Sequence, residues 1–494
     1  MKDKLFHLVE SLSFGEIQHF RESARRRRTD GSARYLQLFE EILEVTRNSS
    51  KESLDEYLQD GTLRVLRHRL FNNILSSLET FQTYRQAKGG LHSVIRQIEI
   101  LHSKGIHPPI QRLFEEGIKT GKQIEDFKGV VALYDVYMEV IFESASIANM
   151  PGESLIQLAK ERQAIKALED DLDALKMLRT QIYSQGDGGA TDFAKLSQSI
   201  LEHPILQAAQ NHGYSSHSAE LLSLQIQFHL KRLAGQFAET APILDRGLQL
   251  FAENPVLLRD HASIRLHLGL FVYNRGLLAA YQGDRDTARR MAAQLAHVKG
   301  QEILLFERLP ALNLQIAILE KDWGMAEAVI AEINAGLVVH RGKITPKREG
   351  IYHYQMVRYY LANGKPQLAL PSILEMINYS DEDKSYRNQF AWILLLIAHL
   401  DLGNYEFVID RLRVTRAYFR KHGLLTEFEF ETLEWIKRLA QTGDTPDRPQ
   451  VLEGMAQGMA AFKSRPEYIA RTFYFDFQRW VKAKQLGTTI HSLL

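Results

Sequence analysis

The chain has 494 residues, 45% of them hydrophobic and 24% charged, and its 61 Lys and Arg residues balance 60 Asp and Glu residues. This composition excludes a wholly disordered chain, which requires low hydrophobicity and strong charge repulsion. The absence of cysteine excludes disulfides, thiolate metal sites and cysteine nucleophiles.

The apolar segments of the chain are short. The stretch from Leu5 to Val9 is shorter than the ~7–15-residue core of a secretory signal. The longest apolar run, Ala391 to Ala398, is well below the ~20 residues that a bilayer requires. We therefore expect a cytoplasmic protein with no membrane insertion.

Residues 1–88 predict an N-terminal helical cap, with one helix from about Leu63 to Tyr84. A run of four arginines lies between two earlier apolar-periodic stretches of this cap: Arg25, Arg26, Arg27 and Arg28. Such a run complements the negative end of a helix dipole, and this explanation is sufficient. The alternative is a basic patch that contacts nucleic acid or an acidic partner, although nucleic-acid modules usually carry a basic face over a whole domain.

Residues 89–217 predict irregular helical hairpins. Leu91, Ile95 and Ile98 recur at helical spacing, as do Val130 and Leu133. Turn residues separate these helices. One later stretch, from Leu222 to Leu230, alternates with a strand-like period, but its flanking residues favour a helix.

Residues 218–424 contain a recurring turn pattern, Gly-x-aromatic-x-x-Ala, in degraded form. The pattern is typical of the turn between two antiparallel helices, where the small last residue lies at their closest crossing. Its five copies are residues 235–240, 283–288, 321–326, 364–369 and 403–408. Lys321 replaces the turn glycine in the third copy, and Thr240 replaces the small alanine in the first.

These copies resemble the tetratricopeptide repeat family, most closely at Trp392, Leu395, Gly403 and Tyr405. The spacing here is longer and less even than the family's period of about 34 residues. The layout of the whole chain is also similar to uncharacterised bacterial helical-repeat proteins. The resemblance implies an all-α fold, an α-solenoid of stacked antiparallel helical hairpins that forms a superhelix.

Residues 425–494 predict C-terminal capping helices, because a stack of hairpins requires atypical ends. This segment contains a dense aromatic cluster: Phe473, Tyr474, Phe475, Phe477 and Trp480. The cluster either packs over the last hairpin or forms an exposed self-association patch. We therefore expect either a monomer or a homodimer.

The sequence lacks the motifs of the common enzyme classes. No His-Glu-x-x-His and no Gly-x-Ser-x-Gly is present, and the eighteen histidines do not pair at metal-binding spacing. The segment Gly117 to Lys122 resembles a phosphate loop, but it is one residue short and no strand precedes it. We expect no catalytic residues, no metal and no cofactor.

The resemblance places function on the concave surface that the first helix of each hairpin lines. Counting back from each turn by the family's spacing puts eight polar and aromatic residues there: Gln225, His229, Arg232, Tyr273, Arg308, Gln315, Tyr354 and Arg358. Arginine clamps carboxylates and aromatic rings add contact area, so this surface fits an acidic or C-terminal peptide of a protein partner. The alternative is that these are ordinary solvated residues on helices whose phase differs from the family's.

Two functions follow from these observations. The first is a non-enzymatic protein–protein interaction scaffold that binds a partner peptide or protein on the concave face. The second is a regulator whose N-terminal basic segment contacts nucleic acid while the repeats bind a peptide.

Overall fold

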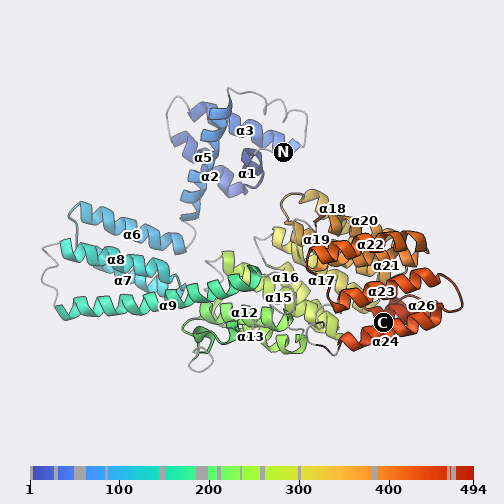
Figure 1. Cartoon of the computed structure of the whole chain (residues 1–494). Coiled ribbons are helices and arrows are strands. Elements are labelled where there is room, and N and C mark those ends of the chain that lie inside the picture. Colours follow the sequence, from blue (N-terminus) through green and yellow to red (C-terminus); the bar gives the residue numbers. More distant parts are fainter. Residues whose placement is uncertain are drawn as a thin grey trace. The chain divides into compact units, whose positions relative to one another are not determined.

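The protein is all-helical in every range that its structure describes. The computed structural model describes residues 4–26, 32–48, 63–83, 87–143, 152–184, 199–207, 213–233, 236–255, 262–298, 302–379, 386–463, 465, 468 and 474–493. No strand occurs in these ranges, and successive helices pack on their chain neighbours (Figure 1). The predicted all-α class with stacked helical hairpins is therefore confirmed. None of the helices in these ranges has both the length and the apolar character needed to span a bilayer.

Residue contacts divide the chain into two compact units, Met1–Glu169 and Asp170–Leu494. The division falls inside one long helix, α9, which runs through Gly152–Ser184. It also falls inside the segment 89–217 that the sequence predicts as irregular hairpins. Each unit has a hydrophobic core of its own.

The first part of the N-terminal unit is a small helical bundle. Its helices are α1 (Lys4–Glu10), α2 (Phe14–Arg26), α3 (Ser32–Asn48) and α5 (Leu63–Thr83). Helix α2 starts with a capping box, in which the Ser13 backbone N–H donates to Glu16 Oε2 at 2.7 Å. Fully buried side chains such as Phe39 and Ile74 form the core between the helices. Helix α5 matches the helix that the sequence predicts from Leu63.

The second part of the N-terminal unit contains α6 (Ala87–Ser103), α7 (Ile110–Gln123), α8 (Phe127–Glu143) and the first half of α9. Helices α6, α7 and α8 pack on one another. Two buried glycines of α7 permit this close approach, because a Cβ on Gly117 would meet Leu133 at 2.6 Å and one on Gly121 would meet Val130 at 2.3 Å. The segment that resembles a phosphate loop is therefore a helix packed against two others, not a glycine-rich loop.

The C-terminal unit is a stack of helical hairpins. Its elements after α9 are α12 (His217–Leu233), η1 (Phe237–Glu239), α13 (Thr240–Glu253), α15 (Ala262–Gln282), α16 (Arg285–Ala296), α17 (Glu302–Glu320), α18 (Trp323–Val339), α19 (Pro346–Ala362), α20 (Pro366–Tyr379), α21 (Tyr386–Asp401), α22 (Tyr405–Lys421), α23 (Glu427–Thr442), α24 (Arg448–Lys463), α26 (Phe477–Gln485) and η2 (His491–Leu493). Helices α15, α17, α19, α21 and α23 also contact one another in order. They form a continuous layer of first helices, as stacked hairpins require.

The predicted turns join the two helices within a hairpin. Gly283, Gly364 and Gly403 have φ values of 82°, 68° and 76°, which glycine adopts without a steric penalty. Lys321, at the equivalent position, adopts the same left-handed conformation with φ of 58°. The small residue that closes each of these copies is fully buried: Ala288, Ala326, Ala369 and Val408.

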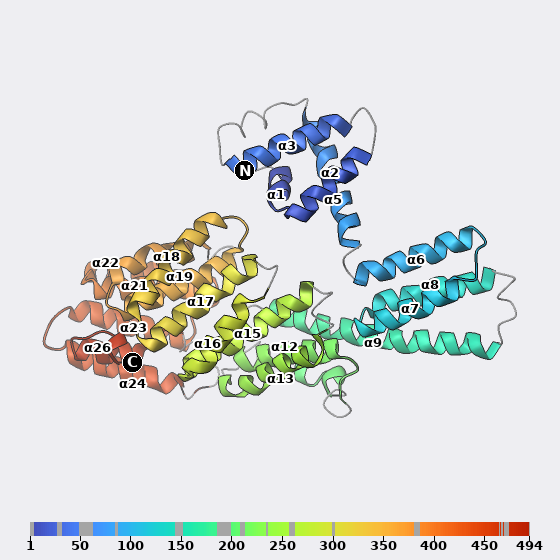
Figure 2. The same cartoon turned by 180° about the vertical axis from the view of Figure 1, so that it is seen from behind.

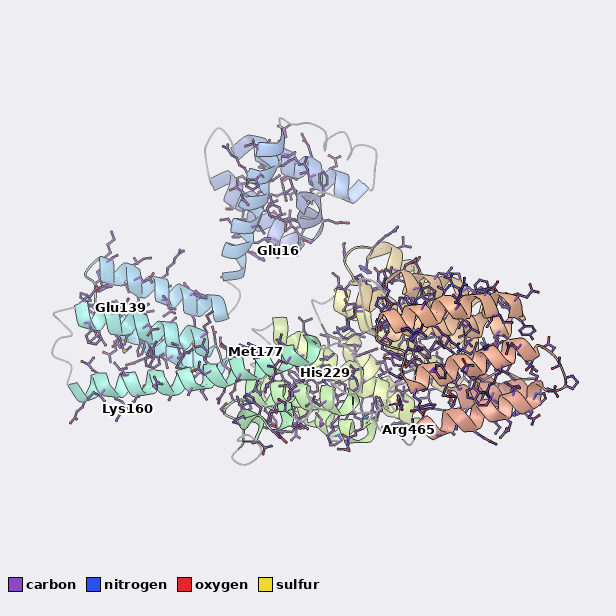
Figure 3. All side chains as sticks on the ribbon, in the orientation of Figure 1. Glu16, Glu139, Lys160, Met177, His229 and Arg465 are labelled. Atoms are coloured by element: carbon purple, nitrogen blue, oxygen red, sulfur yellow. The ribbon has the colours of Figure 1, made fainter. Side chains whose placement is uncertain are left out.

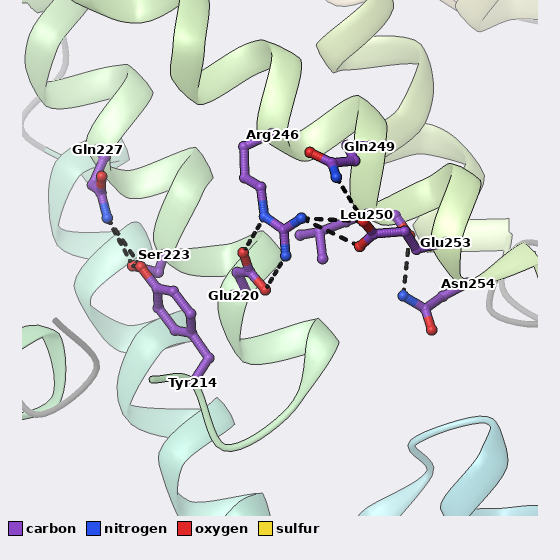
Figure 4. Close-up of polar contacts among 9 residues, drawn as sticks. All are labelled: Tyr214, Glu220, Ser223, Gln227, Arg246, Gln249, Leu250, Glu253 and Asn254. Carbon is purple, nitrogen blue, oxygen red and sulfur yellow. Dashed lines mark hydrogen bonds and ion pairs between the residues drawn. The ribbon is translucent and has the colours of Figure 1, made fainter. Parts of the chain in front are cut away.

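The first hairpin, α12 and α13, is joined by an ion-pair network (Figure 4). The Arg246 guanidinium on α13 donates to both oxygens of Glu220 on α12, at 2.7 and 3.2 Å. It also contacts Glu253 at 3.2 Å. The stretch from Leu222 to Leu230 lies within α12, so its strand-like alternation does not produce a strand.

The C-terminal helices close the end of the stack, with α24 beside α23 and α26 beside α24 (Figure 2). Three members of the aromatic cluster, Phe475, Phe477 and Trp480, are at most 5% exposed and belong to the core of the last hairpins. Tyr474 is half-buried, and Phe473 lies outside the described residues. These buried rings do not form an exposed self-association patch.

Candidate partner-binding site

The structure buries most of the eight residues that the sequence places on the concave face. Exposure is at most 8% for five of them: Gln225, His229, Tyr273, Arg308 and Gln315. Tyr354 and Arg358 are half-buried, and Arg232 is exposed. A partner therefore reaches only some of these side chains, and their predicted binding role depends on which of them face open space.

Two of the buried residues, Gln225 and His229 on α12, belong to a polar cluster that also contains residues of α9 and α15. Arg179, on the second half of α9, donates to Gln225 Oε1 at 3.3 Å and lies 3.5 Å from His267 Nε2. His229 lies on α12 and is labelled in Figure 3. Burial, together with the neighbouring cations Arg232, Lys347 and Arg179, lowers the pKa of His229 to about 3. His229 is therefore neutral at physiological pH. These contacts lie within the fold, and the sequence did not predict the contribution of Arg179.

Two other predicted residues, Gln315 and Arg358, line a cavity of about 600 Å³. The cavity lies at the carboxyl ends of α15, α17 and α19, and the C-terminal segment 475–491 forms its remaining wall. Its volume is within the range of about 300–1,000 Å³ that ligand pockets occupy. Polar and apolar side chains both contribute to its lining.

The charge of the cavity is mainly positive. Four cationic side chains line it, Arg285, Lys321, Arg358 and Arg479, and they face one carboxylate, Asp476. Asp476 Oδ1 accepts the backbone N–H of Arg479 at 3.1 Å and so caps α26, and its Oδ2 lies 3.6 Å from Arg479 Nε, which leaves Arg285, Lys321 and Arg358 as the excess positive charge. The cavity is therefore suited to an anionic group.

Aromatic rings position Arg358 at the edge of the cavity. Its guanidinium carbon lies 5.7 Å from the centre of the Tyr354 ring, and its Nη1 donates to Tyr281 Oη at 3.5 Å. Neither contact is with a carboxylate. Tyr281, which is 56% exposed, adds open ring area to the wall.

The C-terminal segment is held against α18 and α19 by specific contacts. The Tyr354 hydroxyl donates to the backbone oxygen of Tyr474 at 3.0 Å. Burial raises the pKa of Tyr354 to about 12, which keeps this hydroxyl protonated. The His491 ring stacks on Trp323 with 4.4 Å between ring centres, and burial lowers its pKa to about 4. Sequence periodicity predicts a cap but gives no signal that the cap returns to these helices.

Only part of the basic run of the N-terminal unit can be placed. Arg25 is exposed near the end of α2, the side chain of Arg26 lies outside what the structure describes, and so do residues 27–31. Helix α2 lies antiparallel to α5, since His19 contacts Ser77 at 3.0 Å and Gly15 lies next to Phe81. Arg25 therefore lies toward the end of α5 that carries the exposed Arg69.

The described residues contain no group of three or more His, Asp or Glu side chains that could hold a metal ion. Comparison with protein-family models gives no match, and comparison with curated proteins finds no similar sequence. The candidate site is therefore defined by its geometry alone.

Proposed function

We propose that this chain is a non-enzymatic protein–protein interaction scaffold that binds an acidic segment of a partner in the cavity beside Arg358. The observation that carries the proposal is the cavity itself, about 600 Å³ in volume and lined by four cationic side chains and one carboxylate. We also propose that the hairpins form a tetratricopeptide-like superhelix and that the protein acts in the cytoplasm as a monomer or homodimer.

The chemistry of the cavity favours a carboxylate-bearing peptide. A guanidinium binds a carboxylate through two parallel hydrogen bonds. Among the described residues, Arg358 contacts the Tyr281 hydroxyl and the Tyr354 ring, and Asp476 acts on it only electrostatically. The carboxamide of Gln315 can pair with a peptide group, and Tyr281 offers an aromatic surface. The C-terminal segment keeps these groups close together, which lowers the ordering cost of binding.

The proposal is tested by affinity purification of the tagged full chain from its native cell, followed by mass spectrometry. We compare the wild type with Lys321→Gln/Arg358→Gln and with Arg413→Gln, a matched control on α22 whose side chain is exposed outside the cavity. Loss of a charge-assisted contact worth roughly 1.5–3 kcal/mol should reduce recovery of the partner about ten- to hundredfold. Identical partner lists for all three proteins would refute the proposal.

The second candidate function, a regulator that contacts nucleic acid, depends on the arginine run in the N-terminal unit. The exposed side chains of Arg25 and Arg69 favour it, because they lie toward the same end of the bundle. The test is filter binding of duplex DNA at low salt to the wild type and to a variant with alanine at positions 25–28. This function is rejected if the wild type does not bind or if the variant binds equally well.

A further inference from the structure

We propose that the partner segment is extended and carries two acidic groups, one bound in the cavity at Arg358 and the other at a second basic site. We define the second basic site as Arg308 on α17 with Arg348 on α19. This inference rests on the proposed function, and it adds the length and charge pattern of the ligand.

The second basic site contains an arginine that is buried without sufficient partners. Arg308 is 6% exposed, and its Nε and Nη1 atoms have no hydrogen-bond partner among the described residues. A buried polar group without a partner costs roughly 1–3 kcal/mol, and a charged group costs more. Binding of an anion at this point would remove that cost.

One carboxylate is shared between the two arginines of this site. Glu307 Oε2 lies 3.8 Å from Arg308 Nη1 and 3.6 Å from Arg348 Nε, so both distances exceed that of a hydrogen bond. Two guanidinium groups facing one carboxylate leave an excess positive charge. Burial and the proximity of Arg348 lower the pKa of Arg308 to about 10, so it remains charged at neutral pH.

Arg348 is the solvent-exposed part of the second basic site, and the Tyr352 hydroxyl is a further hydrogen-bond donor near it. The side chain of Arg348 is 30% exposed and that of Arg308 is 8% exposed, so Arg348 is the more accessible of the two arginines. The hydroxyl of Tyr352 on α19 is also buried without a hydrogen-bond partner in the described ranges. An incoming carboxylate would thus meet Arg348 first and could then accept from Tyr352.

Each basic site has one arginine on α19, and this shared helix sets the distance between the two sites. Arg348 and Arg358 are ten residues apart on α19, which corresponds to a rise of about 15 Å and an offset of about a quarter turn. An extended peptide rises about 3.3 Å per residue, so four to five residues span this distance. Arg387 adds positive charge between the two sites. It donates to the backbone oxygen of Lys347 at 2.9 Å and acts electrostatically on Tyr354.

The experiment measures fluorescence anisotropy of labelled twelve-residue Ala/Ser peptides that carry one glutamate, or two glutamates separated by one to eight positions. Low ionic strength is used because salt screens such contacts. We expect the tightest binding when the glutamates are four or five positions apart, about tenfold tighter than with one glutamate. Arg348→Gln should remove this gain without changing the affinity for the single-glutamate peptide, and Arg413→Gln should change neither.

The outcomes separate this inference from the function on which it rests. If single-glutamate peptides bind through Arg358 and no spacing improves binding, the inference fails while the proposed function stands. If no peptide binds at 1 mM and Arg358→Gln retains all partners in the purification, both fail. If an oligodeoxythymidylate of matched length binds more tightly than the best peptide, the two sites recognise phosphates and the peptide assignment is overturned.

Discussion

The substitution Trp480→Phe tests how the C-terminal cap is held. Trp480 is 1% exposed, and its Nε1–H lies 3.1 and 3.2 Å from the two carboxylate oxygens of Asp401, at the end of α21. Lys484 Nζ lies 2.9 Å from one of the same oxygens, and the Asp401 side chain is 4% exposed. One buried carboxylate therefore joins α26 to the end of α21.

The expected loss of stability in Trp480→Phe follows from the burial of the Asp401 carboxylate. Burial raises the pKa of Asp401, while Lys484 and the Trp480 donor oppose the rise, so the ionised form depends on both partners. A hydrogen bond to a charged group is worth roughly 1.5–3 kcal/mol, so Trp480→Phe should destabilise the cap by about 2 kcal/mol beyond the packing loss. Trp392→Phe is the matched control, because the buried Trp392 Nε1 has no hydrogen-bond partner among the described residues.

Hydrogen–deuterium exchange of each helix measures the effect where it occurs, which matters because a protein of this size need not unfold in one step. A loss of about 2 kcal/mol corresponds to roughly thirtyfold faster exchange in α26 of Trp480→Phe. Exchange in α21 of Trp392→Phe should rise much less. Equal acceleration in the two variants would refute the role assigned to the Asp401 carboxylate.

Two further predictions concern the turns and the response to acid. Gly403→Ala should lower the free energy of unfolding by about 1 kcal/mol, because φ is 76° at this position. The control Gly324→Ala, in the first turn of α18, should be neutral or stabilising. Urea unfolding of α21–α22 that is unchanged by Gly403→Ala would contradict this prediction. Burial lowers the pKa of His491 to about 4, from about 6.5 in the unfolded chain. Between these two pH values the unfolded chain binds a proton that the folded chain does not, so the free energy of unfolding falls as pH decreases, by about 2 kcal/mol at pH 5. His491→Gln should remove this contribution, and a destabilisation relative to the wild type that is the same at pH 7 and pH 5 would exclude it.

The turns could be predicted from sequence because they depend on local chemistry. Gly283, Gly364 and Gly403 occur where the chain requires a left-handed residue, and a fully buried small or β-branched residue follows each of them. Lys321 shows the limit of this rule, since the packing of α17 on α18 imposes the left-handed conformation on a residue that does not favour it. Turn position is thus more predictable than the residue that occupies it.

The candidate site was only partly predictable. Arg358 and Gln315 were identified because they lie on first helices near predicted turns, and both line the cavity. Gln225 and His229 come from the same counting rule, but both are buried, and Gln225 accepts a hydrogen bond from Arg179 of α9, which the counting rule does not include. The wall formed by residues 475–491 depends on contacts such as that of Tyr354 with Tyr474, 120 residues away, which no local pattern encodes.

The return of the C-terminal segment has a consequence for how this stack unfolds. In a linear repeat array each hairpin contacts only its neighbours, so the ends can fray independently of the middle. Here Trp323 and Tyr359 contact His491, and Tyr354 contacts Tyr474, so the end of the chain is bound to hairpins in the middle of the stack. The described residues between 302 and 493 therefore form a closed loop of contacts, and we expect the hairpins of this region to melt together rather than repeat by repeat.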